Sequence, residues 1–195
     1  GNFLRITDVR SAICLSCHNM DGWMTGAHAN SPAHTPHRSI DPRTQLAYNT
    51  VADNGCMICH QIHSAQGRER LLRFQREEDN CLNCHDGSLA PANIAGDIRK
   101  PSRHPVELFV GRHEPNEDPW TMRRHVECAD CHNPHAAMHQ TVSNDGRPSF
   151  GLVNGALRFV SGVDRLGHSI PRAREEYEVC FKCHADGVVR PIRPR

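Results

Sequence analysis

All ten cysteines of this 195-residue chain fall within one repeated pattern, Cys-x-x-Cys-His. The copies are CLSCH (14–18), CMICH (56–60), CLNCH (81–85), CADCH (128–132) and CFKCH (180–184). The pattern is typical of covalent c-type haem attachment, because two thiols at this spacing can add to the two vinyl groups of one porphyrin. The histidine that follows then lies under the iron and becomes its proximal ligand.

The motif therefore predicts five covalently bound haem c groups and names the residues that would hold them. Thioether bonds are expected at Cys14, Cys17, Cys56, Cys59, Cys81, Cys84, Cys128, Cys131, Cys180 and Cys183. The proximal iron ligands are expected to be His18, His60, His85, His132 and His184.

Three other uses of paired cysteines fit the pattern less well. Disulfides would explain the even number of cysteines, but not a histidine after every second one. Structural zinc sites commonly take two Cys-x-x-Cys pairs per metal, and five pairs cannot be divided in that way. Thioredoxin-like redox chemistry uses one such motif beside a βαβ unit, not five copies.

The chain is poor in the residues that fill a protein core. Aromatic residues make up 5% of it, the mean hydropathy is −0.61, and there are 14 glycines and 13 prolines. Side-chain burial alone would hardly offset the conformational entropy of such a chain. We therefore expect one domain, residues 1–195, that is mostly irregular with a few short α-helices. A stacked chain of five c-type haems would form its core.

The iron of each haem can take a second, distal ligand, and ten histidines outside the motifs are available for this role. His63 and His135 follow a motif histidine by three residues, and His125 precedes Cys128 by three. Each is therefore better placed to reach a neighbouring haem than its own. Met20 is an alternative type of ligand, although packing is its more ordinary role.

The chain resembles the doubled C-x-x-C-H multihaem cytochromes, closely over residues 48–187 and more loosely before them. The resemblance rests on CMICHQIHSA, NCLNCHDG, SRHPV, HVECADCHNPHAA and EYEVCFKCHAD. It implies bis-histidine haems in a continuous chain, with distal ligands at His28, His63, His104, His125 and His135. His34, His37 and His113 compete with His28 for the fifth position, whereas His139 and His168 are expected at the surface.

Secondary structure is predicted at three places. Residues 68–79 contain strong helix formers, and residues 171–184 read as a helix that begins at Pro171. Residues 155–167 could form a short hairpin with Ser161 and Gly162 at its turn. The proline-rich stretches 30–42 and 100–119 are expected to be irregular.

The expected function is electron transfer, because an iron with two histidine ligands has no open position for a substrate. The family includes cytochromes that form extracellular filaments, which implies self-association, possible polymerisation, and transfer to redox partner proteins or extracellular acceptors. A reductase of a small nitrogen or sulfur oxyanion and a soluble periplasmic shuttle are the alternatives.

The expected location is outside the cytoplasm, because haem is attached to this motif there. We expect an extracellular or cell-surface protein, or otherwise a periplasmic one, and the start at Gly1 resembles a trimmed mature chain. The formal net charge of +1 gives no sign of nucleic-acid binding. The sequence has no apolar run long enough for a membrane span.

Intact-mass measurement of the purified protein tests the haem assignment. The mass should exceed the 21.9 kDa of the bare polypeptide by five haem groups, and metal analysis should find five irons per chain. A mass equal to that of the polypeptide, or zinc in place of iron, would contradict the assignment.

Overall fold

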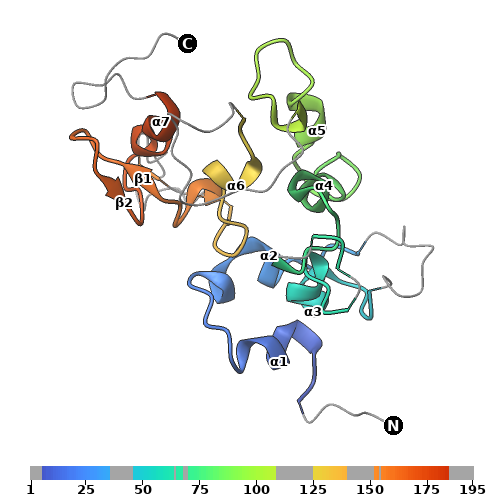
Figure 1. The fold of residues 1–195 in the computed structure, drawn as a ribbon. Helices are drawn as coiled ribbons and strands as arrows, with labels where there is room; N and C mark the ends of the chain where they lie inside the picture. Colours follow the sequence, from blue (N-terminus) through green and yellow to red (C-terminus); the bar gives the residue numbers. More distant parts are fainter. Residues whose placement is uncertain are drawn as a thin grey trace, which may run out of the picture.

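The fold is described from a computed structural model over residues 6–35, 46–63, 65–67, 70–108, 125–139, 152–153 and 155–184. Within these ranges the chain is mostly irregular and has short helices and one small sheet (Figure 1), as expected from the sequence. The α-helices are α1 (Ala12–Leu15), α2 (Ala27–Asn30), α3 (Val51–Asn54), α4 (Glu77–Leu82), α5 (Ile94–Asp97), α6 (Cys128–Cys131) and α7 (Glu176–His184). Short 3-10 turns lie at Val9–Ser11, Trp23–Thr25, Gly55–Ile58, Val106–Leu108 and Gly155–Leu157.

The sheet consists of β1 (Gly162–Val163) and β2 (Ser169–Ile170), which pair in antiparallel fashion. Gly162 lies opposite Ile170, and Val163 lies opposite Ser169. The sheet packs through β1 against α7. None of the helices in the described ranges is long and apolar enough to cross a membrane.

Each Cys-x-x-Cys-His motif forms a single helical turn. In the first four motifs the histidine N–H donates to the carbonyl of the first cysteine, at 2.9–3.0 Å. The fifth motif lies inside α7. Residues three and four positions apart share one face of a helix, so the turn presents both sulfurs and the imidazole on the same side.

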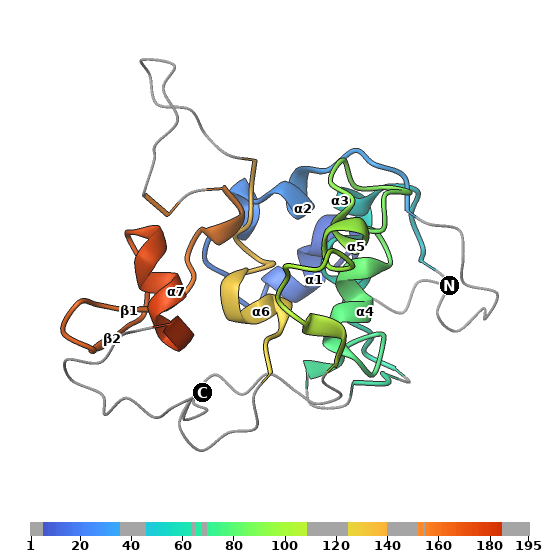
Figure 2. The same cartoon turned by 90° about the horizontal axis from the view of Figure 1, so that it is seen from above.

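The helices that carry the motifs follow one another through the molecule in chain order. In Figure 1, α1 lies at the bottom, α4 and α6 lie in the middle, and α7 lies at the upper left. The turn at Val9–Ser11 packs against α3 and against the turn at Gly55–Ile58, and α4 contacts α6. Figure 2 shows α7 with β1 and β2 on the side of the molecule away from α4 and α5.

Buried apolar side chains other than Trp23 are small. In the described part of the chain the buried apolar residues are Trp23, Ala29, Val51, Ala52, Ala95, Val106, Ala136, Val160, Val163, Ala173 and Val179. Val160, Ala173 and Val179, the last of them in α7, form one buried cluster. Alanine and valine bury little area each, so these side chains supply only a modest share of the stabilisation that a chain of this length needs.

The predicted helix over residues 68–79 is wrong over residues 70–76 and right over residues 77–79. Residues 70–76 form turns and bends, and the helix α4 begins only at Glu77. The Leu71 carbonyl accepts from Gln61 N–H at 2.6 Å, and Arg73 N–H donates to Cys59 at 2.9 Å. Backbone pairing with the second motif therefore overrides the helix propensity of this segment.

The other two predictions are right in type but shifted in position. The C-terminal helix begins at Glu176 rather than Pro171, because residues 173 and 174 are engaged in backbone bonds with Val160 and Val153. The hairpin is present, but Gly162 lies in β1 and the turn spans 164–168. In the proline-rich stretches, residues 31–35 and 101–105 are irregular, and residues 36–42 and 109–119 lie outside the described ranges.

Gly55, just before the second motif, lies very close to Ser11, just before the first motif. Its φ is +50°, and a Cβ at this position would lie 1.9 Å from Ser11 Oγ, which itself accepts from Cys56 N–H at 2.6 Å. We expect Gly55→Ala to lower the free energy of unfolding by about 2 kcal/mol or more, measured by guanidinium unfolding of the holoprotein.

The matched control for this variant is Gly96→Ala in α5. A Cβ there meets nothing closer than 3.4 Å, so stability should stay unchanged or rise by up to about 1 kcal/mol. Equal losses in the two variants would contradict the proposed close contact at Gly55.

The Glu178 side chain binds the backbone just before the start of α7. Its carboxylate accepts from the backbone N–H of Arg174 at 2.6 Å and of Glu175 at 3.0 Å, and these bonds lower its pKa from the ordinary 4.5. The carboxylate therefore stabilises the fold above pH 4.5, and this contribution is lost as the pH falls through the lower folded-state pKa.

We accordingly expect Glu178→Gln to lower the melting temperature at neutral pH and to match the wild-type protein at acid pH. Glu176→Gln, at an exposed position of the same helix, is the control and should melt like the wild-type protein throughout. Thermal melts across the pH range measure both, and a pH-independent loss in Glu178→Gln would contradict the role of its charge.

Candidate functional site

Three motif histidines each face a histidine from outside the motifs. The ring centres of His60 and His135 lie 6.1 Å apart, those of His85 and His28 lie 6.3 Å apart, and those of His184 and His104 lie 6.1 Å apart. The members of each pair come from distant segments of the chain. Their ring planes differ in relative orientation, with angles of 5°, 89° and 47° respectively.

This spacing fits an iron between two imidazoles. Two metal–nitrogen bonds of about 2 Å, with about 1 Å from each nitrogen to its ring centre, place the two ring centres about 6 Å apart. Within the described ranges, no three side chains of His, Cys, Asp or Glu gather in a way that could hold a metal ion. The histidines meet in pairs, which is the arrangement that the two axial positions of a haem iron require.

Backbone carbonyls orient several of these histidines. His60 Nδ1 donates to the Arg70 carbonyl at 2.7 Å, and His28 Nδ1 donates to the Pro134 carbonyl at 2.9 Å. His132 Nδ1 makes the same kind of bond to the Ala156 carbonyl at 3.1 Å. A carbonyl can only accept, so Nδ1 carries the proton and Nε2 keeps the lone pair that a metal needs.

Burial favours the neutral form of two of the paired histidines. It lowers the pKa of His85, with smaller effects from His28 and His132, and it lowers the pKa of His135, with smaller effects from His60 and His28. A metal ligand must be the neutral imidazole, so this environment favours the form that can bind iron.

The motif cysteines lie close to those of the next motif along the chain. The Cys14 thiol is near Cys56, Cys59 is near Cys84, and Cys81 hydrogen-bonds with Cys128. Cys131 lies near both cysteines of the fifth motif. Burial is the main cause that raises the pKa of Cys59, to about 12. In the described part of the chain, which contains all ten cysteines, no disulfide forms.

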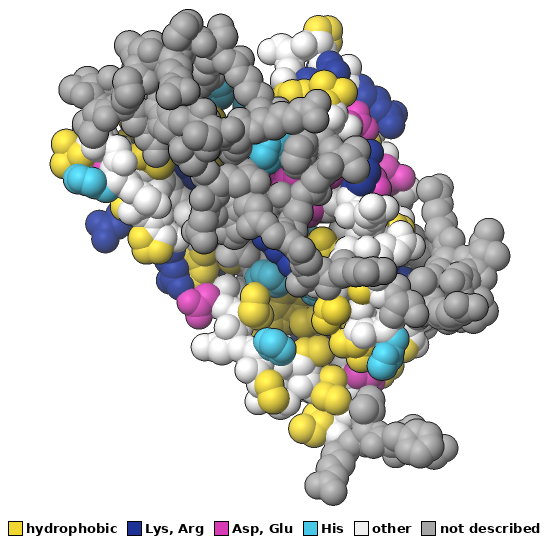
Figure 3. Space-filling view, viewed as in Figure 1, with side chains coloured by type: hydrophobic (Ala, Val, Ile, Leu, Met, Phe, Trp, Pro, Cys, Tyr) yellow, Lys and Arg dark blue, Asp and Glu magenta, His cyan; other side chains and the backbone are white. Residues whose placement is uncertain are grey.

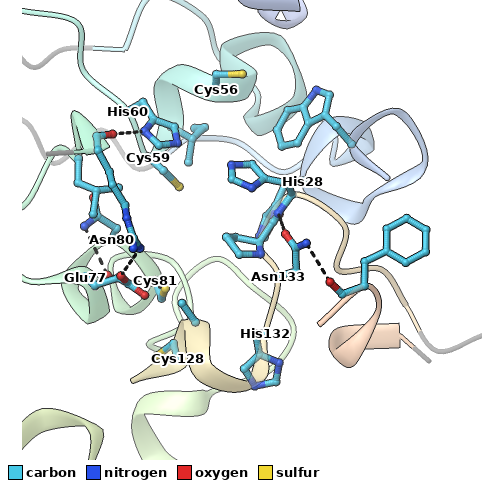
Figure 4. Close-up of a pocket in the computed structure, with 18 of the residues that line it drawn as sticks. His28, Cys56, Cys59, His60, Glu77, Asn80, Cys81, Cys128, His132 and Asn133 are labelled. Atoms are coloured by element: carbon cyan, nitrogen blue, oxygen red, sulfur yellow. Dashed lines mark hydrogen bonds and ion pairs between the residues drawn. The ribbon is translucent and has the colours of Figure 1, made fainter. Parts of the chain in front are cut away.

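One cavity of about 430 Å³ connects several motifs, a volume within the usual range of cofactor pockets. Cysteines of the second, third and fourth motifs, Cys56, Cys59, Cys81 and Cys128, line it together with His28, His60, His132 and His135 (Figure 4). On the face shown in Figure 3, apolar and histidine side chains gather around a hollow in the lower half of the molecule. The donor set and the cavity fit covalently attached haem.

Several histidines selected from the sequence lie outside the three pairs. His18, His63 and His132 are exposed, and His125 is half-buried. His34, His139 and His168 are exposed, and His168 Nδ1 lies 3.1 Å from an Asp164 carboxylate oxygen. Met20 is half-buried. His37 and His113 lie outside the described residues.

Sequence reasoning missed the groups that orient the histidines of the pairs and His132. These are the backbone carbonyls of Arg70, Pro134 and Ala156, together with Trp23, whose ring lies edge-on to His135 with 6.4 Å between ring centres. Every residue carries a carbonyl, so no residue type marks such a partner. Only the Asn-Pro-His sequence after the fourth motif, at 133–135, offered a local signal.

Comparison with known proteins agrees with the haem-binding geometry. A family model described as "Doubled CXXCH motif" matches residues 49–89, which contain the second and third motifs. The multiheme cytochrome MtrA of Shewanella baltica (strain OS185) is 25% identical over 180 residues, which cover 91% of this chain and 32% of that protein. The chain thus spans about a third of the length of this curated relative. No solved structure matches this chain.

The repeated helical turns, the paired histidines and these two similarities lead to the same assignment. Each supports covalently bound c-type haem. The chain carries the doubled C-x-x-C-H motif and is similar to a multiheme c-type cytochrome along most of its length.

Proposed function

We propose that the chain is a pentahaem electron-transfer protein with residues 1–195 as one unit. Cys14, Cys17 and their counterparts in the other four motifs would hold the haems, and the five motif histidines would be the proximal ligands. His135, His28 and His104 would be the distal ligands opposite His60, His85 and His184. His63 and His125 remain our candidates for the irons of His18 and His132.

The three histidine pairs carry this proposal. Each pair joins one motif histidine to one histidine from elsewhere, with 6.1–6.3 Å between ring centres. Two histidines on one iron would hold it from both sides and would leave no place for a substrate. When bound, haem supplies an iron that exchanges a single electron between its ferric and ferrous states. Hydrogen bonds to the Arg70 and Pro134 carbonyls hold the rings in place and so limit structural change between these states.

The proximity of cysteines in successive motifs supports a linear order of sites. A cysteine of each motif lies near a cysteine of the next one in the sequence, from Cys14 and Cys56 to Cys131 and Cys180. We infer that the five redox sites follow the order of the motifs, so that an electron enters at one end of the chain of sites and leaves at the other.

The exposure of the two end motifs supports transfer to partners. Cys17 and His18 are exposed in the first motif, and Cys180, Cys183 and His184 are exposed in the last. These ends could meet redox partner proteins, an extracellular acceptor or a second copy of the chain. We propose that the protein is exported and works in extracellular electron transfer, and that it can assemble into a filament. Electron micrographs test this last step: continuous fibres support it, and discrete particles contradict it.

Replacement of the distal histidines tests the iron assignment. We expect His28→Ala, His135→Ala and His104→Ala each to convert one low-spin iron to the high-spin form, seen by EPR of the oxidised protein. Carbon monoxide should then bind one iron per reduced chain. His168→Ala is the matched control, because this exposed histidine faces Asp164, and it should leave the spectrum unchanged.

The wild-type protein is the second control. It should show only low-spin iron and should not bind carbon monoxide. A high-spin iron in the wild-type protein would instead favour the reductase, which needs an open coordination position. Low-spin spectra in all three variants would contradict the proposed ligands.

A further inference from the structure

Two hydrogen bonds join α2 to the loop at 133–137, which is distant in the sequence. Ala27 N–H donates to the Ala137 carbonyl at 2.7 Å, and His28 Nδ1 donates to the Pro134 carbonyl at 2.9 Å. The bonds come from adjacent residues and reach both ends of the loop. We call this unit, residues 26–28 with 133–137, the clasp.

Asn133 gives the loop its shape. Its Oδ1 accepts from His135 N–H at 3.0 Å, and its carbonyl accepts from Ala136 and Ala137 N–H at 3.0 and 2.8 Å. Its Nδ2 donates to the Phe159 carbonyl at 3.4 Å, and Figure 4 shows Asn133 beside the cavity. The loop has little freedom to change shape while these bonds are intact.

Close packing fixes the clasp against the N-terminal segment. Ala136 is completely buried, and a Cβ on Gly22 would lie 2.8 Å from Ala136 Cβ. A Cβ on Gly26 would lie 3.1 Å from the His135 carbonyl oxygen. Side chains larger than those present would push the two segments apart, so the loop and α2 are held as one body.

The clasp contains one histidine from each of two different pairs. His135 faces His60 of the second motif, whereas His28 faces His85 of the third. The pair with His104 and His184 shares no residue with the clasp. Any movement of the loop against α2 must therefore alter two pairs and leave the third one in place.

We propose that the clasp positions the distal ligands of two neighbouring haem irons together, with Asn133 as the positioning residue that sets the geometry of both. The inference rests on the proposed bis-histidine ligation and deepens it. Asn133 does not contact iron; it acts through the His135 N–H and through the Pro134 carbonyl that orients His28. The second and third redox sites then respond jointly to a change at a residue that is a ligand of neither.

The ring angles allow the two sites to be observed separately. The His60–His135 planes are nearly parallel at 5°, and the His85–His28 planes are perpendicular at 89°. Parallel axial imidazoles give a rhombic low-spin ferric EPR signal, whereas perpendicular ones give a signal dominated by one large g value. The intermediate angle of 47° for His104 and His184 provides an internal reference.

Two variants that act on opposite sides of the clasp test the proposal in the holoprotein. Asn133→Ala removes the bond to His135 N–H. Ala27→Pro removes the N–H that donates to Ala137, and proline is acceptable at the first position of α2 because Gly26 before it is extended. In both variants we expect the rhombic and the large-g signals to shift, and the midpoint potentials of those two sites to shift with them. The signal of the third pair should stay unchanged.

Asn133→Asp and Asp164→Ala are the matched controls. Asn133→Asp keeps the side-chain oxygen that accepts from His135 N–H and should restore most of the wild-type spectrum. Asp164→Ala removes the same kind of bond, here to Leu166 and His168 N–H in the turn after β1, and should shift neither signal. Full haem content by mass in every variant shows that attachment and folding are preserved.

A shift in only one of the two signals, or a shift in all three pairs, would overturn the inference. So would unchanged spectra in both Asn133→Ala and Ala27→Pro. These outcomes differ from failure of the proposed function, which would appear in the wild-type protein as missing haem or as high-spin iron before any variant is made.

Discussion

The helical turn of the Cys-x-x-Cys-His motif is the constraint on which the other features depend. A bond from the histidine N–H to the first cysteine carbonyl closes the turn in four motifs. The fifth motif is part of the helix α7. Two sulfurs and an imidazole then face the same side, which is what one porphyrin requires. The attachment is local, so it needs no large protein core to form it.

The rest of the chain is organised to bring a second histidine to each site that the structure pairs. Buried apolar residues in the described part are mainly alanine and valine, which leaves room beside the motifs for a cavity lined by cysteines and histidines. His135, the partner of His60, lies in the loop at 133–137, and His28, the partner of His85, lies in α2. The bond from His28 to the Pro134 carbonyl joins the helix to the loop. Stability and ligand geometry thus depend on the same backbone hydrogen bonds.

The sequence predicted the type of fold better than it predicted where the helices and strands begin and end. It predicted a mostly irregular chain with few helices, and the described residues have that character. The helix expected over residues 68–79 is present only from Glu77, because Leu71 and Arg73 make backbone bonds with Gln61 and Cys59 instead. Helix propensity is worth a few tenths of a kcal/mol per residue, so such long-range bonds can override it. The helix expected from Pro171 begins five residues later because its first residues bond to Val153 and Val160.

The sequence by itself predicted c-type haem as the cofactor, the cysteines that would bind it and the proximal histidines, because all of these residues lie within a motif of five consecutive residues. It also supplied the set of histidines from which distal ligands could come. Only the tertiary structure decided that His135 faces His60, that His28 faces His85 and that His104 faces His184. These pairs join segments that are distant along the chain, and their ring angles depend on backbone carbonyls that every residue carries and no sequence pattern marks.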